Sequence, residues 1–221
     1  TEAVINYDKA KFNVKAAELK QEDVKAFEAF IIDAQTNVRR EVKGVNIMSY
    51  ASPEGEIDKN NNLASDRAIS AEGYLTNFYT KSKLTAPAGL ITKSPKGEDW
   101  DGFKKEVEKT THEDKDLILR VLEMTSDLNK REEDIRNMAK TYSFLEKEVL
   151  PQLRRSQMVM TYDKVGYSDD ELKQLSKSNP DTLTVEELLY TAELVEDLNE
   201  KLRIYTEAER LFADDYRVVS N

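Results

Sequence analysis

Hydrophobic and polar residues alternate in several short segments of the chain, the pattern typical of β-strands. The clearest case is the segment 42–51, where Val45 and Ile47 point to one face and Met48 and Tyr50 to the other. Three further segments have shorter apolar runs of the same kind: residues 4–7, 90–92 and 158–162. The pattern therefore predicts a central strand at 42–51 and three shorter strands.

Apolar residues recur every three or four positions between these strands, which is the spacing of amphipathic helices. The spacing predicts helices at 18–37 and 63–78, and a wholly helical stretch from 99 to about 150 that Pro151 ends. Strands joined by helices predict an α/β (α+β) sandwich, in which helices pack on one face of a small mixed sheet. A pair of helices is expected near the C-terminal end, at about 184–197 and 199–212.

Charge is divided unevenly along the 221 residues, whose formal net charge is −10. Residues 168–221 hold 14 acidic and 6 basic side chains, whereas the remainder is near neutral. This difference predicts two domains: residues 1–166, with a helical insertion at about 99–148, and residues 167–221, an acidic helical segment. Binding to a nucleic-acid backbone needs clustered Lys and Arg, so no nucleic-acid partner is expected. No run of roughly 20 apolar residues is present, so we predict no transmembrane segment.

The chain has no Cys and a single His, which excludes disulfides and thiolate metal sites. His112 lies in a polar segment without a second imidazole and is expected to be solvent-exposed. No nucleophile–base pair, Gly-rich phosphate loop or dinucleotide fingerprint is present. We therefore expect a protein that is not an enzyme and that has no metal site and no cofactor.

The most informative motif begins in the predicted central strand and continues into the next helix. The stretch Ile47–Gly55, followed by Asn60, Leu63 and Arg67, resembles the OmpA-like (OmpA/MotB C-terminal) peptidoglycan-binding domain. That family has an apolar strand ending in Gly-x-Thr-Asp, a turn with Gly, and Asn-x-x-Leu-Ser-x-x-Arg-Ala opening a helix. In that comparison Gly55 is the turn Gly, and Asn60 is the Asn before the helix.

The flanking segments agree with this resemblance. The spacing from Ser52, at the family's Asp position, to Arg67 is the family's own. Lys96-Gly97-Glu98 resembles the Gly-x-Gly-Glu after the third strand, and Arg154-Arg155 resembles the Arg pair that opens the last strand. The resemblance covers about residues 4–165 and implies the order β-α-β-α-β-(helical insertion)-β.

The resemblance also implies a ligand and a set of ligand-binding residues. The family binds the diaminopimelate group of the peptidoglycan stem peptide, a zwitterion whose ammonium is held by a carboxylate and whose carboxylate is held by a guanidinium. Arg67 would grip the ligand carboxylate, and Asn60 would order the loop and donate to the ligand. The other matched positions are expected at the same site: Ala51, Ser52, Leu63 and Arg154.

Each of these residues also has an ordinary structural interpretation. A helical Arg67 is commonly a surface residue or a member of an ion pair, and Asn60 is a suitable helix cap. Arg154 and its neighbour Arg155 are suitable for protecting a strand edge. The single Trp, Trp100, is expected to anchor the insertion to the sheet.

Ser52 departs from the family pattern because a hydroxyl supplies no countercharge for an ammonium. A hydrogen bond to a charged group contributes about 1.5–3 kcal/mol, against roughly 0.5–1.5 kcal/mol for a neutral one. The loss is on the order of one kcal/mol or more, at least about tenfold in affinity. Three acids in the same turn could partly replace the missing charge: Glu54, Glu56 and Asp58.

The acidic C-terminal segment resembles one tetratricopeptide-type repeat with the entry to a second. Leu188, Tyr205 and Ala208 have the spacing of that repeat, whereas Lys201 stands where a small residue belongs and Ala213 where Pro is usual. Solenoid repeats need about three stacked copies, so we expect the chain to be part of a longer protein. The alternative is a terminal α-helical hairpin packed on the preceding domain.

Two functions follow from the resemblance. The first is a non-catalytic cell-envelope module that binds peptidoglycan and anchors an outer-membrane or lipid-attached protein in the periplasm of a Gram-negative bacterium. The second is an OmpA-like scaffold that has lost peptidoglycan binding and mediates protein–protein assembly. In both, the C-terminal helices are expected to recruit protein partners.

Overall fold

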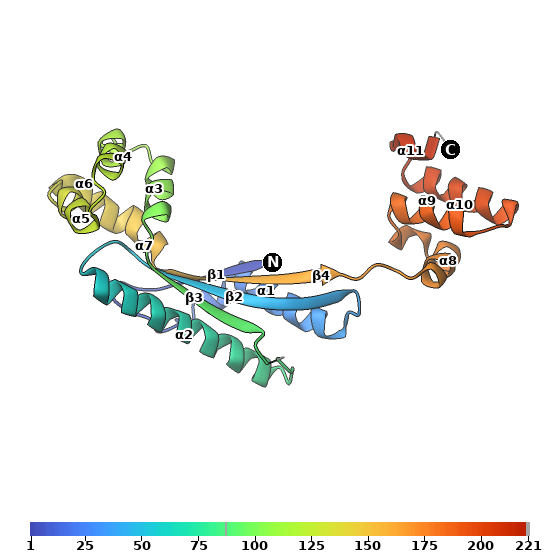
Figure 1. Ribbon diagram of the computed structural model, residues 1–221, viewed down its shortest axis with the longest axis horizontal. Coiled ribbons are helices and arrows are strands. Elements are labelled where there is room, and N and C mark those ends of the chain that lie inside the picture. The colour runs from blue at the N-terminus through green and yellow to red at the C-terminus, as the bar shows by residue number, and fades with distance from the viewer. Residues whose placement is uncertain (87, 220–221) are drawn as a thin grey trace. The chain divides into compact units, whose positions relative to one another are not determined.

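The computed structural model describes residues 1–86 and 88–219, and it has a mixed α/β fold, which confirms the sequence prediction at that level. The chain divides into two compact units, Thr1–Lys164 and Val165–Asn221. The first unit contains a four-stranded sheet, two helices along it and a helical insertion (Figure 1). The second unit is wholly helical where it is described.

The sheet of the first unit has the strand order β1-β4-β2-β3. β2 pairs antiparallel with β4 and parallel with β3, and β1 pairs antiparallel with β4. A parallel pair needs a crossover connection, which α2 provides between β2 and β3. The four strands and this helix are β1 (Glu2–Asn6), β2 (Arg40–Ala51), α2 (Ile57–Lys81), β3 (Ile91–Glu98) and β4 (Arg155–Lys164).

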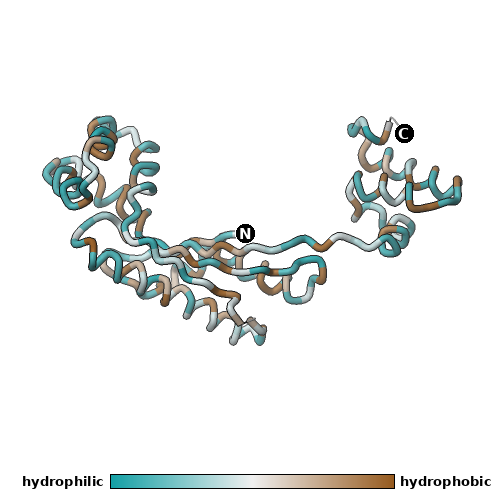
Figure 2. Tube along the Cα trace, viewed as in Figure 1, coloured by the Kyte–Doolittle hydropathy of each residue, from teal (hydrophilic) through white to brown (hydrophobic). Residues whose placement is uncertain are grey.

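The helices of the sandwich lie along one face of this sheet (Figure 1). Alternate residues of β2 face them, so that from Val45 to Ala51 every second side chain is buried. Figure 2 shows hydrophobic and hydrophilic residues mixed along α2, whose buried residues recur every three or four positions. Besides α2, the helical layer contains a 3-10 turn (Glu18–Lys20) and α1 (Glu22–Thr36). The core between sheet and helices includes Ile5, Phe27, Ile31, Ile47, Leu75 and Met158.

The free edge of the sheet at β1 is closed by carboxylates. Asp23 accepts a hydrogen bond from the amide of Val4 at 2.8 Å, and Glu18 accepts one from the amide of Asn6 at 3.0 Å. The suggestion that Arg154 and Arg155 protect a strand edge is wrong, because β4 lies between β1 and β2. Capping of edge amides by side chains prevents another strand from pairing there.

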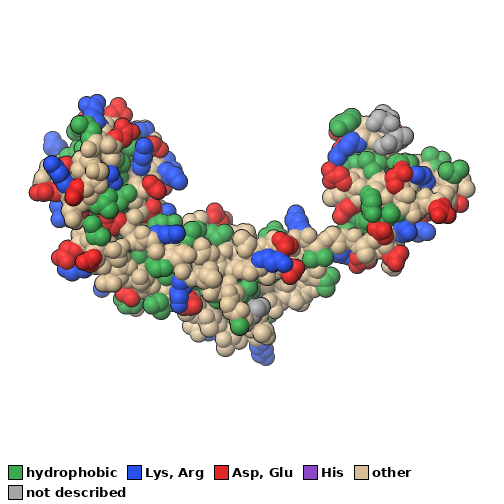
Figure 3. All heavy atoms as spheres, in the orientation of Figure 1, with side chains coloured by type: hydrophobic (Ala, Val, Ile, Leu, Met, Phe, Trp, Pro, Cys, Tyr) green, Lys and Arg blue, Asp and Glu red, His purple; other side chains and the backbone are tan. Residues whose placement is uncertain are grey.

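The helical insertion lies between β3 and β4 and has a hydrophobic core of its own. That core contains Phe103, Val107, Ile118, Ile135, Leu145, Val149, Leu150 and Leu153. Acidic and basic side chains intermingle on its surface (Figure 3). It consists of α3 (Trp100–Lys109), α4 (Lys115–Met124), α5 (Leu128–Arg136), α6 (Ala139–Phe144), a π-helical turn (Leu145–Val149) and α7 (Leu150–Leu153).

Two side chains of the insertion had sequence-based expectations. His112 is half-buried rather than exposed, because its ring stacks on Phe144 with centroids 4.3 Å apart. Trp100 packs in the insertion core and donates from Nε1 to Glu98 of β3 at 2.9 Å, so it anchors the insertion to the sheet as expected.

The C-terminal unit contains a helix that the spacing of apolar residues did not reveal, α8 (Asp169–Ser178). It begins with a capping box in which Ser168 and Glu171 bond reciprocally to each other's backbone amides. The predicted pair of helices is present, in slightly shorter form. The remaining elements are a 3-10 turn (Pro180–Thr182), α9 (Val185–Leu194), α10 (Leu198–Leu211) and α11 (Tyr216–Val219). Among the described residues, no helix combines the length and the apolar character that crossing a bilayer requires.

Candidate functional site

The residues predicted for the ligand site surround the turn between β2 and α2. Ala51 closes β2 and is buried, and Ser52 follows it. Asn60, Leu63 and Arg67 lie on successive turns of α2. Arg154 reaches the turn from the residue before β4. The fold therefore brings the six predicted positions to one end of the sheet.

Arg67 is fully buried, and its guanidinium binds backbone carbonyl groups. Nε donates to the carbonyl of Lys11 at 3.0 Å, Nη1 to that of Tyr50 at 2.7 Å and Nη2 to that of Asp8 at 3.3 Å. Burial lowers the pKa of Arg67 to about 10, so the side chain is still a cation at neutral pH. The hydrogen bonds of the Arg67 guanidinium connect the segment after β1 to the end of β2. A ligand would reach this guanidinium only if the segment after β1 moved.

A hydroxyl network lies directly beneath Arg67. The phenol of Tyr7 is within 3.2 Å of the Arg67 carbonyl oxygen and 3.0 Å of the Ser156 hydroxyl, which is 2.7 Å from the Ser49 hydroxyl. Burial raises the pKa of Tyr7 to about 12. Sequence reasoning missed this network, although Ser49 and Ser156 stand at inward positions of two alternating strands, where polar residues need a partner.

Glu54 is the carboxylate at the centre of the turn. Its Oε1 lies 2.7 Å from Nη2 and 3.0 Å from Nε of Arg154, and it accepts from the Ser52 hydroxyl at 2.5 Å. The side chains of Glu54 and Arg154 are only 7% and 9% exposed. Nζ of Lys9 approaches the other oxygen, Oε2, at 2.9 Å. Glu54 therefore supplies a negative charge next to Ser52, and Arg154 and Lys9 neutralise it.

Lys9 links the turn to the insertion as well. Its Nζ is 2.7 Å from Glu146, and the two carboxylates together raise the pKa of Lys9 to about 12. Glu132 of α5 accepts a hydrogen bond from the amide of Gly55. The insertion therefore holds the β2–α2 turn from outside the sheet.

Asn60 does not cap α2, because the helix begins three residues earlier at Ile57. Its side-chain amide donates to Oε1 of Glu98 at 2.8 Å and to the carbonyl of Glu54 at 3.3 Å. Asn60 therefore orders the loop, as expected, by tying it to the end of β3.

A cavity of about 390 Å³ opens beside this turn, between α2 and the segment after β1. Ala10, Phe12 and Leu63 give it an apolar wall. Acidic side chains line it as well: Glu54, Glu56 and Asp66. Arg67 and Arg154 are not among its lining residues.

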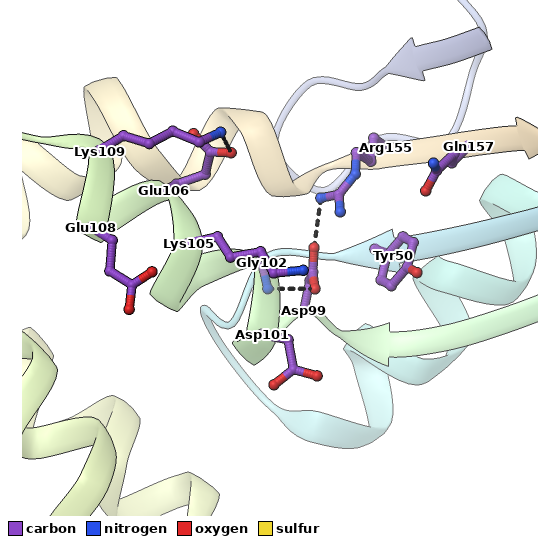
Figure 4. A pocket seen from close by; sticks show the side chains of 10 residues that line it. All are labelled: Tyr50, Asp99, Asp101, Gly102, Lys105, Glu106, Glu108, Lys109, Arg155 and Gln157. Carbon is purple, nitrogen blue, oxygen red and sulfur yellow. Dashed lines mark hydrogen bonds and ion pairs between the residues drawn. The ribbon is translucent and has the colours of Figure 1, made fainter. Parts of the chain in front are cut away.

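A second cavity, of about 550 Å³, lies where α3 meets the ends of β2 and β4 (Figure 4). Asp99 organises it by accepting from the amide of Gly102 at 2.9 Å and pairing with Arg155 at 2.6 Å. Arg155 also stacks on Tyr50, with Cζ 4.6 Å from the ring centroid. These contacts join the start of the insertion to the sheet.

No protein-family model matches the chain, and no curated protein matches it significantly.

Proposed function

We propose that residues 1–164 form a non-catalytic, OmpA-like scaffold that mediates protein–protein assembly and does not bind the peptidoglycan stem peptide. The observation that carries the proposal is the state of the two guanidinium groups. Arg67 donates to three backbone carbonyls, and Arg154 pairs with the buried Glu54. Arg67, which was expected to grip the ligand carboxylate, and Arg154, which was expected at the same site, both stabilise the fold instead.

A zwitterion needs a carboxylate and a cation that face the same space. Among the described residues, the lining of the 390 Å³ cavity contains three acids and a single cation, Lys59. Lys59 is about three-quarters exposed beside Glu56, so solvent screens its charge and it holds a carboxylate only weakly. The charge of this cavity is unfavourable for the ligand carboxylate, which supports the scaffold over the cell-wall anchor.

The resemblance assigns the scaffold to the periplasm, next to the outer membrane of a Gram-negative bacterium. The C-terminal unit adds a helical surface that holds most of the excess negative charge of the chain. We include in the proposal that this acidic helical unit recruits protein partners.

Anchoring to peptidoglycan is the second candidate, and one observation favours it. The 390 Å³ cavity is open beside Asn60 and Leu63, two of the positions that match the family motif. This volume falls within the usual range for ligand pockets, about 300–1,000 Å³.

Cosedimentation with purified sacculi distinguishes the two candidates. The scaffold proposal expects the full chain to stay in the supernatant, as does Leu63→Glu, which places a charge in the cavity wall. Sedimentation of the wild type that Leu63→Glu abolishes would establish cell-wall binding and overturn the proposal. Arg67→Ala is a poor probe here, because Arg67 holds the fold together.

A further inference from the structure

The 550 Å³ cavity beside α3 contains an arginine, Arg155, whose guanidinium is only partly used by the fold. Nη1 of Arg155 donates to the carbonyl of Gln152 at 3.2 Å and lies 2.6 Å from Oδ2 of Asp99. Nε and Nη2 have no partner among the residues that the structure describes. Because Nε and Nη2 each direct one N–H toward the same side of a guanidinium, a complete donor edge of Arg155 is unused.

The guanidinium of Arg155 is held in place although this edge is unused. Its Cζ lies 4.6 Å from the centroid of the Tyr50 ring, which covers one face of the guanidinium. Asp99, on the opposite edge, is itself fixed by the amide of Gly102 at 2.9 Å. The Arg155 side chain is 22% exposed, and it lines the cavity (Figure 4). A donor pair that is fixed before a ligand arrives loses little conformational entropy on binding, so this edge is preorganised for an acceptor with two oxygens.

The charges that α3 contributes to the cavity suit a ligand with a single negative charge. Lys105 is exposed and has no ion pair or hydrogen bond within the described ranges 1–86 and 88–219. Asp101 and Glu108 are exposed as well, and in Figure 4 their carboxylates point away from Arg155. The other charged residues of α3 at the cavity form an ion pair, Lys109 with Glu106. A carboxylate meets less repulsion from these acids than a phosphate dianion does.

We propose that this cavity binds the side-chain carboxylate of an acidic residue of a partner protein. The inference rests on the scaffold function, and it names the chemistry of one contact. The two carboxylate oxygens accept from Nε and Nη2 of Arg155, a bidentate arrangement that the planar guanidinium favours. The ammonium of Lys105 adds a second positive charge at the same cavity. Because Arg155 is recessed, a carboxylate on a side-chain stem reaches it more readily than one at the end of a chain.

An NMR titration of the full chain tests the proposal with N-acetyl-glutamate N-methylamide as the probe. The glutamine analogue, uncharged and nearly isosteric, is the matched control. With the glutamate probe we expect saturable shifts of the Arg155 Nε–H resonance and of the Tyr50 and Gly102 amides, and the glutamine probe should bind at least about fivefold more weakly. Equal binding of the two probes, or no saturable shift with the glutamate probe, would overturn the inference. Tighter binding of N-acetyl-alanine, whose carboxylate ends a chain, would overturn the side-chain source of the carboxylate.

Variants locate the site at Arg155. Arg155→Lys keeps a cation beside Asp99 but lacks the donor edge, so it is expected to weaken binding of the glutamate probe at least about fivefold. Lys105→Met changes an exposed side chain without a partner in the described chain, and it is expected to weaken binding at least about twofold. Arg120→Lys, at an exposed position of α4, is the control and leaves the affinity unchanged. Wild-type affinity in Arg155→Lys or in Lys105→Met, or a loss in Arg120→Lys, would contradict the assigned site.

The same titrations separate this inference from the scaffold function. Saturable binding of diaminopimelate at Asn60 and Leu63 would overturn the scaffold function itself. Flat titrations with both the glutamate probe and diaminopimelate would overturn only the carboxylate site at Arg155.

Discussion

Nη2 of Arg154 lies 2.7 Å from Oε1 of Glu54, and both side chains are less than a tenth exposed. Removing one member of a buried ion pair leaves the other as an uncompensated charge, which costs about 3–5 kcal/mol. The contact therefore has a structural consequence that can be measured apart from any ligand.

We predict that Glu54→Gln lowers the free energy of unfolding by about 3–5 kcal/mol, and that Arg154→Met lowers it by less because Lys9 still pairs with Glu54. Urea unfolding followed by the fluorescence of Trp100, the only Trp, reports on the first unit. The double variant Glu54→Gln/Arg154→Met is expected to lose much less unfolding free energy than the sum of the losses in the two single variants. The exposed pair Glu56–Lys59 is the control, and Lys59→Met should change stability by less than about 1 kcal/mol. Additive losses for Glu54 and Arg154 would mean that the two charges are not coupled.

Arg67→Lys tests whether Arg67 belongs to the fold. An ammonium cannot reproduce the planar set of donors that reaches the carbonyls of Lys11, Tyr50 and Asp8. Carbonyl groups left without a donor in a buried place cost about 1–3 kcal/mol each, so we expect a loss of about 3 kcal/mol. Urea unfolding provides the measurement, and wild-type stability in Arg67→Lys would mean that these hydrogen bonds contribute little.

Gly102 of α3 is expected to tolerate no side chain. A Cβ atom there would lie 2.1 Å from Oδ2 of Asp99, whose carboxylate is held by the Gly102 amide and by Arg155. We predict that Gly102→Ala loses about 1–3 kcal/mol in urea unfolding, as overpacked sites do. Gly73→Ala is the matched control: it has open space in the exposed interior of α2 and should gain about 0.5–1 kcal/mol. Equal effects at the two positions would contradict the assigned role of Asp99.

Tyr7 predicts a dependence of stability on alkaline pH. Burial raises its pKa from 10.0 to about 12 in the folded protein, so the folded state retains the phenol proton after the unfolded chain has lost it. The contribution of Tyr7 to the free energy of unfolding is therefore fully present below pH 10 and is lost as the pH rises through about 12. Tyr7→Phe should reduce the fall in unfolding free energy over this window by on the order of 2 kcal/mol. An unchanged slope in Tyr7→Phe would assign the alkaline sensitivity to other groups.

Much of the fold could be predicted from the sequence because the apolar periods are strong. The alternation around Val45 and Ile47 places β2 correctly, and the helical spacing from Asp99 onward identifies the insertion. α8 was missed because its apolar stripe is short, Leu172 and Leu175, and the capping pair Ser168 and Glu171 that marks its start was not used. Hydrogen bonds of the capping box determine where α8 begins, and hydrophobic periodicity alone does not predict the start of a helix.

The candidate site was predictable as a set of positions but not as a set of contacts. The motif spacing brought Ser52, Asn60 and Arg67 to one end of the sheet. The hydrogen-bond acceptors of Arg67 are backbone carbonyls of segments distant in the sequence. A sequence pattern of side chains does not predict which backbone carbonyl accepts a hydrogen bond. The pairing of Glu54 with Arg154 joins residues 100 positions apart, which only the strand order brings together.

A titration with meso-diaminopimelate, followed by amide shifts of Asn60 and Leu63, tests the central claim most directly. The claim is that the guanidinium groups of Arg67 and Arg154 are committed to the fold and do not hold a ligand carboxylate. We predict no saturable shift up to about 10 mM diaminopimelate, tenfold above a 1 mM dissociation constant. Saturation at lower concentration in the wild type, lost in Leu63→Glu, would contradict the account and restore the cell-wall function.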